Sequence, residues 1–344
     1  MSAKAIAENK MLLMRKIYIW MTLLVLGTVL LNSCKKDSDI FVPDPGQQTG
    51  PDSNWYSPVT ASMPVNKLES NLFIPADVNT IVVNDQPDTV ITSSGLICLF
   101  PPYSCVDSTG APVTGSVTVE SNLFISKGDL IRMGMPTTSN GNLLVSGGVV
   151  SLRLKQNNQH LQLAPGVGIA MRFTNAPQQQ QMQYFIGDQT PDGFNWVQKN
   201  NDSNKVYNSP GSEAYQVYTT NLRTINCDYF YGDTSNTTDK TILSVKLTSP
   251  NLTNANTVSY VVFKDLNSLM VMRSDASAKL FTCGKIPIGR DVTIVTISKD
   301  GNFYYLGQQE ITTAAPAAGS NSVAVTITPQ RLSIDQIKAF LNTL

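Results

Sequence analysis

The sequence predicts an all-β protein: two β-sandwich-like domains on a flexible N-terminal tether, with a short C-terminal helix. The 344-residue chain is rich in Thr, Ser, Asn and Val, and only 15% of its residues are charged, a composition typical of strands. Short runs with β-branched residues are separated by Gly, Asn, Asp and Pro, which is the pattern of strands joined by turns. No helical period separates successive runs, so an alternating β-α-β fold is excluded.

Residues 1–33 have the pattern of a signal peptide. A basic segment, 1–16, precedes an uncharged run of 15 residues at 17–31. A membrane-spanning helix needs about 20 apolar residues, whereas a run of this length matches the apolar region of a secretory signal. A plain transmembrane anchor is the alternative.

The end of this run, Leu31-Asn32-Ser33-Cys34, resembles the bacterial lipoprotein box. The resemblance implies cleavage before Cys34 and acyl chains such as palmitate on that cysteine. Because each buried CH₂ contributes about 0.8 kcal/mol, several chains make attachment effectively permanent. Residues 35–39 resemble the export signal of Bacteroidota surface lipoproteins. We therefore expect a lipid-anchored outer-membrane protein on the cell surface, with the periplasmic leaflet as the alternative.

Residues 34–60 are predicted to be a tether. The segment is rich in Pro, Gly, Gln and Ser, and such a composition buries little apolar surface. Trp55 and Tyr56 are aromatic exceptions, and we expect them to dock on the first domain.

Residues 61–238 form the first predicted β domain. Asp107 to Gly110 is expected to be a turn with glycine at positive φ, and Gly115 is expected to open a strand. Gly147-Gly148 predicts a bulge or a close approach of two backbones. Strands are expected at 80–83, 95–100, 116–125, 143–155, 160–173, 182–186 and 215–220.

Two strings of this domain resemble a known group of proteins. One runs from Phe100-Pro101-Pro102 through residues 107–119 to Gly147-Gly148, and the other is Ile225-Asn226-Cys227-Asp228. The same order of motifs occurs in uncharacterised Bacteroidota-type surface lipoproteins whose β domain is similar to the ZU-type domain of ankyrins and netrin receptors. The resemblance implies a ZU-like β domain followed by a C-terminal β-sandwich.

These motifs raise two questions of chemistry, self-cleavage and a site at Cys227 and Asp228. Some ankyrin and netrin-receptor relatives cleave themselves at a His-Phe-Ser triplet, which this chain lacks, so self-cleavage is not expected. Cys227 and Asp228 are either a functional site or part of a last strand in which Asn226 and Asp228 bond to turn backbone. The second reading is favoured because no base or second ligand is identifiable nearby.

Residues 239–330 form the second predicted domain, an immunoglobulin-like β-sandwich. About seven short strands in roughly 90 residues match the size of that architecture. Asp300-Gly301 is the strongest hairpin signal of the chain. The strands are expected at 242–247, 258–264, 269–273, 279–283, 292–298, 303–309 and 322–328.

Residues 331–344 are predicted to form a helix. Ser333 and Gln336 have the spacing of a capping box. An apolar stripe follows at helical spacing and predicts core packing, with a partner-binding helix as the alternative; it comprises Ile334, Ile337, Phe340, Leu341 and Leu344.

Four cysteines remain after Cys34, and an even number in an exported protein is compatible with disulfides. Cys98–Cys105 is the local pairing and Cys227–Cys283 its long-range complement, and two other pairings are possible. The alternative is that all four are small buried hydrophobic residues.

The charges and motifs exclude several functions. Four of the 25 basic and one of the 25 acidic residues precede Cys34, so the mature chain has a net charge of −3, and nucleic acid is not an expected partner. The chain has no HExxH, no CxxC and no phosphate-binding glycine loop, so no metal and no cofactor are expected. The one histidine, His160, is expected at an interior strand position, which disfavours a Ser-His-Asp or Cys-His site.

The sequence therefore predicts a non-enzymatic lipoprotein with a binding or structural role, whose partner is an unknown protein or glycan. A glycan-binding or glycan-processing surface protein is the alternative. Its expected stacking rings are Trp55, Trp196, Tyr229 and Tyr231. An enzyme would need two carboxylates about 5–10 Å apart in a cleft, and no catalytic residue is assigned.

Overall fold

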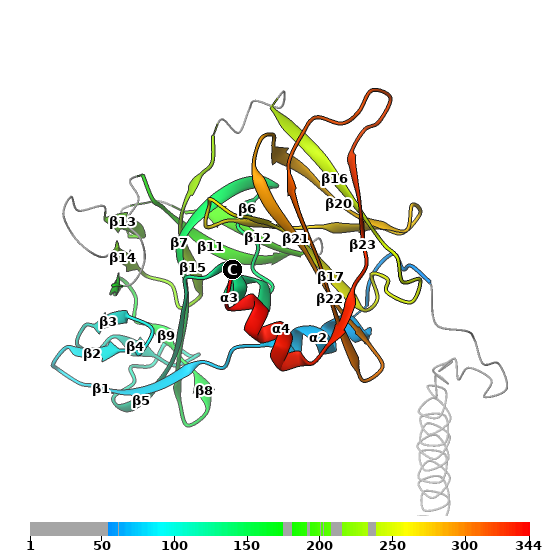
Figure 1. Ribbon diagram of the computed structural model, residues 1–344. Helices are drawn as coiled ribbons and strands as arrows, with labels where there is room; N and C mark the ends of the chain where they lie inside the picture. Colours follow the sequence, from blue (N-terminus) through cyan, green and yellow to red (C-terminus); the bar gives the residue numbers. More distant parts are fainter. Residues whose placement is uncertain are drawn as a thin grey trace, which may run out of the picture. The chain divides into compact units, whose positions relative to one another are not determined.

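A computed structural model describes residues 54–60, 62–174, 181–190, 193–199, 201, 203–207, 215–232 and 239–344. Residues 51–344 form one compact unit. Strands dominate the described part of this unit, and helices are few and short (Figure 1). The all-β prediction is therefore confirmed.

Residues 77–230 form the first sandwich, built from two facing sheets with a shared apolar core. Its long sheet has the order β1 (Asp77–Val83), β5 (Gly115–Phe124), β7 (Asn142–Gln156), β15 (Thr224–Phe230), β11 (Gln183–Thr190) and β12 (Gly193–Gln198), with β6 (Thr138–Ser139) and β8 (Gln159–His160) also paired to β7. Its short sheet has the order β13 (Lys205–Tyr207), β14 (Tyr215–Thr219), β10 (Ile169–Phe173), β3 (Leu96–Phe100) and β2 (Asp88–Ile91). A small ribbon pairs β4 (Cys105–Val106) with β9 (Gln162–Leu163).

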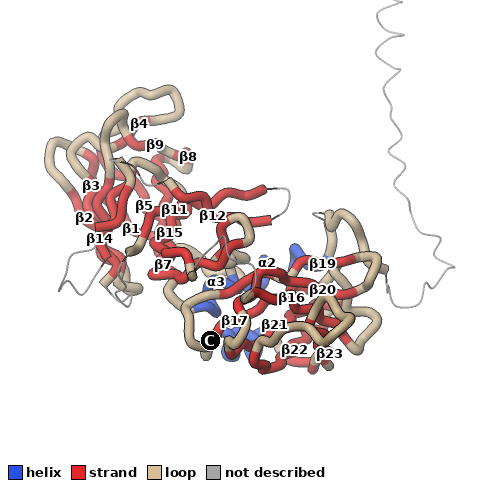
Figure 2. Tube along the Cα trace, turned by 90° about the horizontal axis from the view of Figure 1, so that it is seen from above, coloured by secondary structure: helices blue, strands red, loops and turns tan. Residues whose placement is uncertain are grey.

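Residues 240–332 form the second sandwich, which has its own core between two further sheets. Figure 2 shows the strands of the two sandwiches as separate groups. One sheet has the order β19 (Arg273–Asp275), β20 (Leu280–Pro287), β16 (Lys240–Leu247) and β23 (Val323–Ile327), of which β16 and β23 are parallel. The other has the order β18 (Leu269–Val271), β17 (Thr257–Phe263), β21 (Asp291–Asp300), β22 (Phe303–Thr312) and β24 (Gln330–Leu332).

Three described helices pack into a third core that joins the two sandwiches. Helix α4 (Ile334–Leu341) begins with the predicted capping box of Ser333 and Gln336. Helices α2 (Pro64–Leu72) and α3 (Lys127–Arg132) were not predicted. Pro at the first turn suits α2, and its buried side chains follow helical spacing, whereas Ser126 caps α3 by accepting from Asp129 N at 3.1 Å.

Several turn predictions are confirmed. Asp107 Oδ1 accepts from Ala111 N at 3.0 Å, and Gly110 has a φ of +85°. Gly115 begins β5. The Asp300-Gly301 hairpin joins β21 to β22. At Gly147-Gly148 the β7–β15 pairing shifts register, and a Cβ on Gly147 would lie 2.8 Å from the Tyr215 ring.

Three expectations about strands were wrong. The strand expected at 160–173 is divided into β8, β9 and β10. β8 pairs with β7 whereas β9 pairs with β4, and Pro165 and Gly166 (φ +76°) turn the chain between β9 and β10. His160 lies exposed on the short strand β8, not in an interior position. The strand expected at 269–273 divides at Met272, where the chain passes from one sheet to the other.

The aromatic pair of the tether docks on the second sandwich, and the prediction of docking on the first was wrong. The Trp55 ring centroid lies 5.0 Å from that of Phe281. Tyr56 N donates to Asn254 Oδ1 at 3.0 Å, and Asn254 Nδ2 donates to Tyr56 O at 2.6 Å. The end of the predicted tether is therefore part of the compact unit.

Candidate functional site

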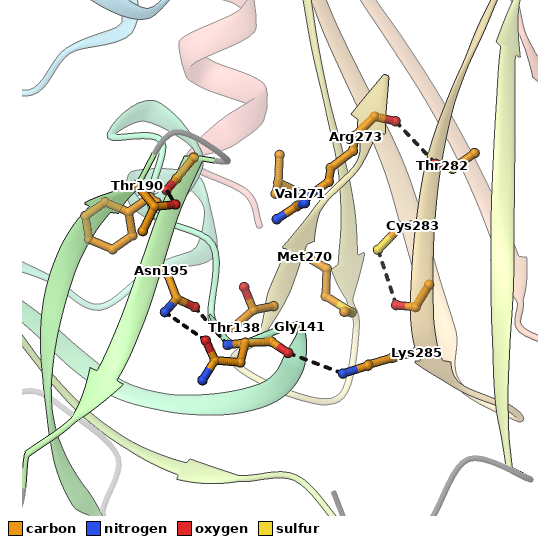
Figure 3. Close-up of a pocket in the computed structure, with 14 residues that line it drawn as sticks. Thr138, Gly141, Thr190, Asn195, Met270, Val271, Arg273, Thr282, Cys283 and Lys285 are labelled. Carbon is orange, nitrogen blue, oxygen red and sulfur yellow. Dashed lines mark hydrogen bonds between the residues drawn. The ribbon is translucent and has the colours of Figure 1, made fainter. Parts of the chain in front are cut away.

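The candidate site is a groove of about 580 Å³ between the two sandwiches (Figure 3). One wall comes from the β6–β7 turn and from the described ends of β11 and β12 in the first sandwich. The other comes from β18, β19 and β20 of the second. A volume of this size lies within the usual range for small-ligand pockets, about 300–1,000 Å³.

The walls are held together by hydrogen bonds between the sandwiches. Thr137 N donates to Leu269 O at 2.9 Å, and Leu269 N donates to Thr137 Oγ1 at 2.8 Å. Asn267 Nδ2 donates to Ser146 O at 2.8 Å, and Ser268 Oγ donates to Leu144 O at 2.7 Å. The bonds of Thr137, Leu269 and Ser268 are buried, and all of these bonds join the two sandwiches beside the groove.

The first wall is shaped by the β6–β7 hairpin. Its loop is Asn140-Gly141, and both residues have positive φ (+50° and +75°). This dipeptide favours the two-residue turns that match strand twist. Asn140 N donates to Asn195 Oδ1 at 2.8 Å, which ties the turn to β12. This bond joins the turn and β12 into one wall of the groove.

Phe194 supplies an aromatic surface to the same wall. Its ring centroid lies 4.8 Å from that of the buried Trp196, at an interplanar angle of 75°. A Cβ on Gly187 would lie 2.5 Å from the Phe194 ring, so glycine makes room for this ring. The half-buried ring can contact an apolar part of a ligand.

The second wall carries Cys283 and Arg273. Burial raises the pKa of the Cys283 thiol to about 12, and the nearby Arg273 charge opposes only part of the rise. The thiol is therefore a poor nucleophile at neutral pH. Arg273 is exposed on β19, and its guanidinium reaches into the groove in Figure 3.

Lys285 bridges the two walls at one end of the groove. It has a φ of +58°, uncommon for a residue with a side chain. Its Nζ donates to Asn140 O at 3.2 Å and to Asn142 Oδ1 at 3.4 Å. Arg273 and Lys285 are the charged side chains among the described residues that line the groove, and both are positive. The groove therefore favours anionic groups.

The predicted lipidation residue, Cys34, lies outside the described residues. The other four cysteines are buried free thiols, so the disulfide alternative was wrong and they are buried hydrophobic residues: Cys98, Cys105, Cys227 and Cys283. Cys98, Cys105 and Cys227 are packed in the core of the first sandwich, and Cys283 lies in the second sandwich at the groove wall.

The rings expected to form a glycan platform do not share one exposed face. Trp196 is 0% exposed, and its Nε1 donates to Pro136 O at 2.8 Å. Trp55 packs on Phe281, and half-buried Tyr229 packs against the first-sandwich core. Half-buried Tyr231 packs against the second-sandwich core.

Cys227 and Asp228 lie in β15 with no exposed surface, so the reading as a strand is the better one. Asp228 has the expected bond to backbone, at Gly147, and side-chain bonds join Asn226 to its neighbours. Asn226 Nδ2 donates to Asp228 Oδ2, and Ser146 Oγ donates to Asn226 Oδ1 at 3.0 Å. Burial raises the pKa of Asp228 well above its usual range, and hydrogen bonds from Ser146, Asn226 and the Gly147 backbone offset only part of the rise.

The groove residues were not predicted from the sequence. Asn140-Gly141 carried a visible turn signal, but Arg273 and Lys285 are isolated charges without a motif. No known family model, curated protein or solved structure matches the chain. In the described part of the chain, no helix has the length and hydropathy to cross a membrane.

Proposed function

We propose that this chain is a non-enzymatic binding protein, anchored to the bacterial outer membrane through acyl chains on Cys34 and exposed at the cell surface. The sequence Leu31-Asn32-Ser33-Cys34 after an uncharged run supports the anchor. The Pro-, Gly- and Gln-rich composition after Cys34 supports a tether between this anchor and the compact unit of residues 51–344. The motifs that resemble Bacteroidota-type surface lipoproteins also support this proposal.

The observation that carries the binding role is the groove between the sandwiches. It has two basic side chains, Arg273 and Lys285, and no acidic one among its described lining residues. An arginine fork binds carboxylate, sulfate or phosphate oxygens in a bidentate manner. Phe194 and Met270 add apolar surface beside these charges. The groove fits an anionic ligand with an apolar portion.

The groove is preorganised for binding. The bonds from Thr137 to Leu269 and from Ser268 to Leu144 are buried, and Lys285 is held by two oxygen acceptors. A site that is already ordered loses less conformational entropy when a ligand binds. This rigidity favours a binding role that needs no closure of the groove.

An array of glycans, peptides and proteins tests the proposal. It is probed with the purified chain and with a variant that combines Arg273→Gln and Lys285→Gln. We expect anionic ligands to bind the wild type. Their affinity for the double variant should be lower by about tenfold or more, because the variant lacks two charged contacts of roughly 0.5–1 kcal/mol each.

A matched control replaces exposed basic residues away from the groove, Lys246→Gln and Arg153→Gln. This variant has the same net charge as the groove variant. Equal loss of binding in both variants would show a non-specific charge effect and contradict the proposed groove.

A further inference from the structure

We propose that the outer face of the short sheet of the first sandwich is a second binding site, and that it takes a strand of acidic glycan. This face is separate from the groove. Two cross-strand rows of side chains point outward from it. The first row is Thr89, Leu99, Ala170, Tyr218 and Lys205, and the second is Ile91, Ile97, Arg172, Gln216 and Tyr207.

The face is open, apolar and hollowed. Ile91 is 69% exposed, and Leu99 and Tyr207 are each 44% exposed. Residues of both rows line a hollow of about 480 Å³. Exposed apolar surface of this kind commonly marks a binding site. From β13 to β2 the face spans about 19 Å, at about 4.8 Å for each strand spacing, which is enough for a short oligosaccharide.

Tyr218 lies flat on this face. A Cβ on Gly168 would be 2.3 Å from Tyr218 Cζ and 2.4 Å from its hydroxyl oxygen. The ring therefore leans along the sheet over Gly168 and presents its other face outward. The C–H face of a sugar can stack on such a ring. Tyr207, with Lys205 Nζ 5.1 Å from its ring centroid, provides a second aromatic surface on the neighbouring strand.

Polar groups beside the rings are free to bind a ligand. Among the described residues, no hydrogen bond or ion pair uses the Arg172 guanidinium or the Gln216 amide, which are paired across β10 and β14. An amide matches sugar hydroxyls, and a guanidinium matches a carboxylate or sulfate.

The charge of the face selects the class of ligand. Its outward charged side chains on the described strands are Arg172 and Lys205, both positive. Asp88, at the start of β2, is turned away and accepts from Val82 N at 2.8 Å. A glycan with carboxylate or sulfate groups complements this pattern.

Two other occupants fit less well. A second copy of the chain on a two-fold axis would bring Arg172 against a like-charged face. An extended peptide adds to a sheet edge, where backbone groups are unpaired, whereas Leu99, Ala170 and Tyr218 lie on strands that are paired on both sides.

The test is calorimetric titration of the full chain in detergent with hexamers of galacturonate, mannuronate and hyaluronan. We expect at least one to bind, and the methyl ester of that hexamer to bind about tenfold more weakly, because its carboxylates are neutral. Tyr218→Ala and Arg172→Gln should each weaken binding about fivefold or more, whereas Tyr218→Phe should retain the affinity.

Arg153→Gln is the matched control, since Arg153 is also exposed in mid-strand but on the long sheet, and it should bind as the wild type does. Circular dichroism melting checks that each variant is folded. The proposal is overturned if none of the three hexamers binds, if the ester binds equally, or if Arg172→Gln and Arg153→Gln behave alike. Self-association that Tyr218→Ala abolishes would also overturn it, because a second copy would then occupy the face.

Discussion

Replacing the buried carboxyl group Asp228 with its isosteric amide should change how the stability of the protein depends on pH. Asp228 is 0% exposed, and burial raises its pKa well above the usual range. In the unfolded chain its pKa is about 3.9. Below that pH the side chain is protonated in both states and has no effect on the pH dependence.

The direction of this pH effect follows from the number of protons that the folded and unfolded states bind. Above about pH 4 the unfolded chain releases this proton while the folded chain keeps it, so rising pH favours unfolding. Each pH unit up to the folded pKa lowers the free energy of unfolding by about 1.4 kcal/mol. Asp228→Asn cannot ionise, so between about pH 5 and the folded pKa of Asp228 the free energy of unfolding of the variant should rise relative to that of the wild type by this amount for each pH unit.

Urea unfolding of both proteins at pH 5, 6 and 7, followed by tryptophan fluorescence, measures this difference. Asp85→Asn, at an exposed turn position, is the matched control. Its free energy of unfolding should change with pH in the same way as that of the wild type. If the Asp228→Asn and wild-type curves also stay parallel with pH, Asp228 is ionised in the folded protein and the reasoning is refuted.

Three further predictions concern packing. Trp196→Ala should lower the free energy of unfolding by about 3–5 kcal/mol in urea titrations, because it empties a fully buried site; a loss below 1 kcal/mol would contradict the packing. Gly128→Ala should lower the free energy of unfolding by about 1–3 kcal/mol or more, because a Cβ there would lie 1.9 Å from Leu341 O. Gly284→Ala is the control: the nearest atom to a Cβ at that position is 3.8 Å away, so this variant should change the melting temperature little. The four buried thiols, including Cys283 with its pKa raised to about 12, should be inert to Ellman's reagent in the folded protein and all react after unfolding without reductant; a disulfide would leave two unreactive.

The sequence predicted what is encoded locally. Strand positions followed from β-branched runs, and the turns at Gly110 and Gly301 followed from residues that favour positive φ. The capping box of Ser333 and Gln336 was likewise visible as a spacing. Helix α2 also carried a local signal, Pro64 followed by apolar residues at helical spacing, which the strand-rich surroundings obscured.

The groove could not be predicted, because it depends on contacts between distant parts of the chain. Lys285 reaches Asn140 across 145 positions of sequence, and Asn140 in turn bonds to Asn195, 55 positions away. Trp196 shows the same limitation. The sequence indicates an aromatic ring that could stack on a sugar, but the fold buries this ring completely. The sequence shows which residues are aromatic or charged, but the order of strands in the sheets decides which face each of these side chains occupies.

The central claim is that Cys34 carries the acyl chains that hold this binding unit on the membrane. The direct measurement is metabolic labelling of cells that express the full chain with an alkyne palmitate analogue, followed by fractionation, for the wild type and Cys34→Ser. We predict a labelled wild type in the outer-membrane fraction and an unlabelled variant that is absent from it. Equal labelling of both proteins, or an unlabelled wild type that stays in the membrane fraction, would contradict the account.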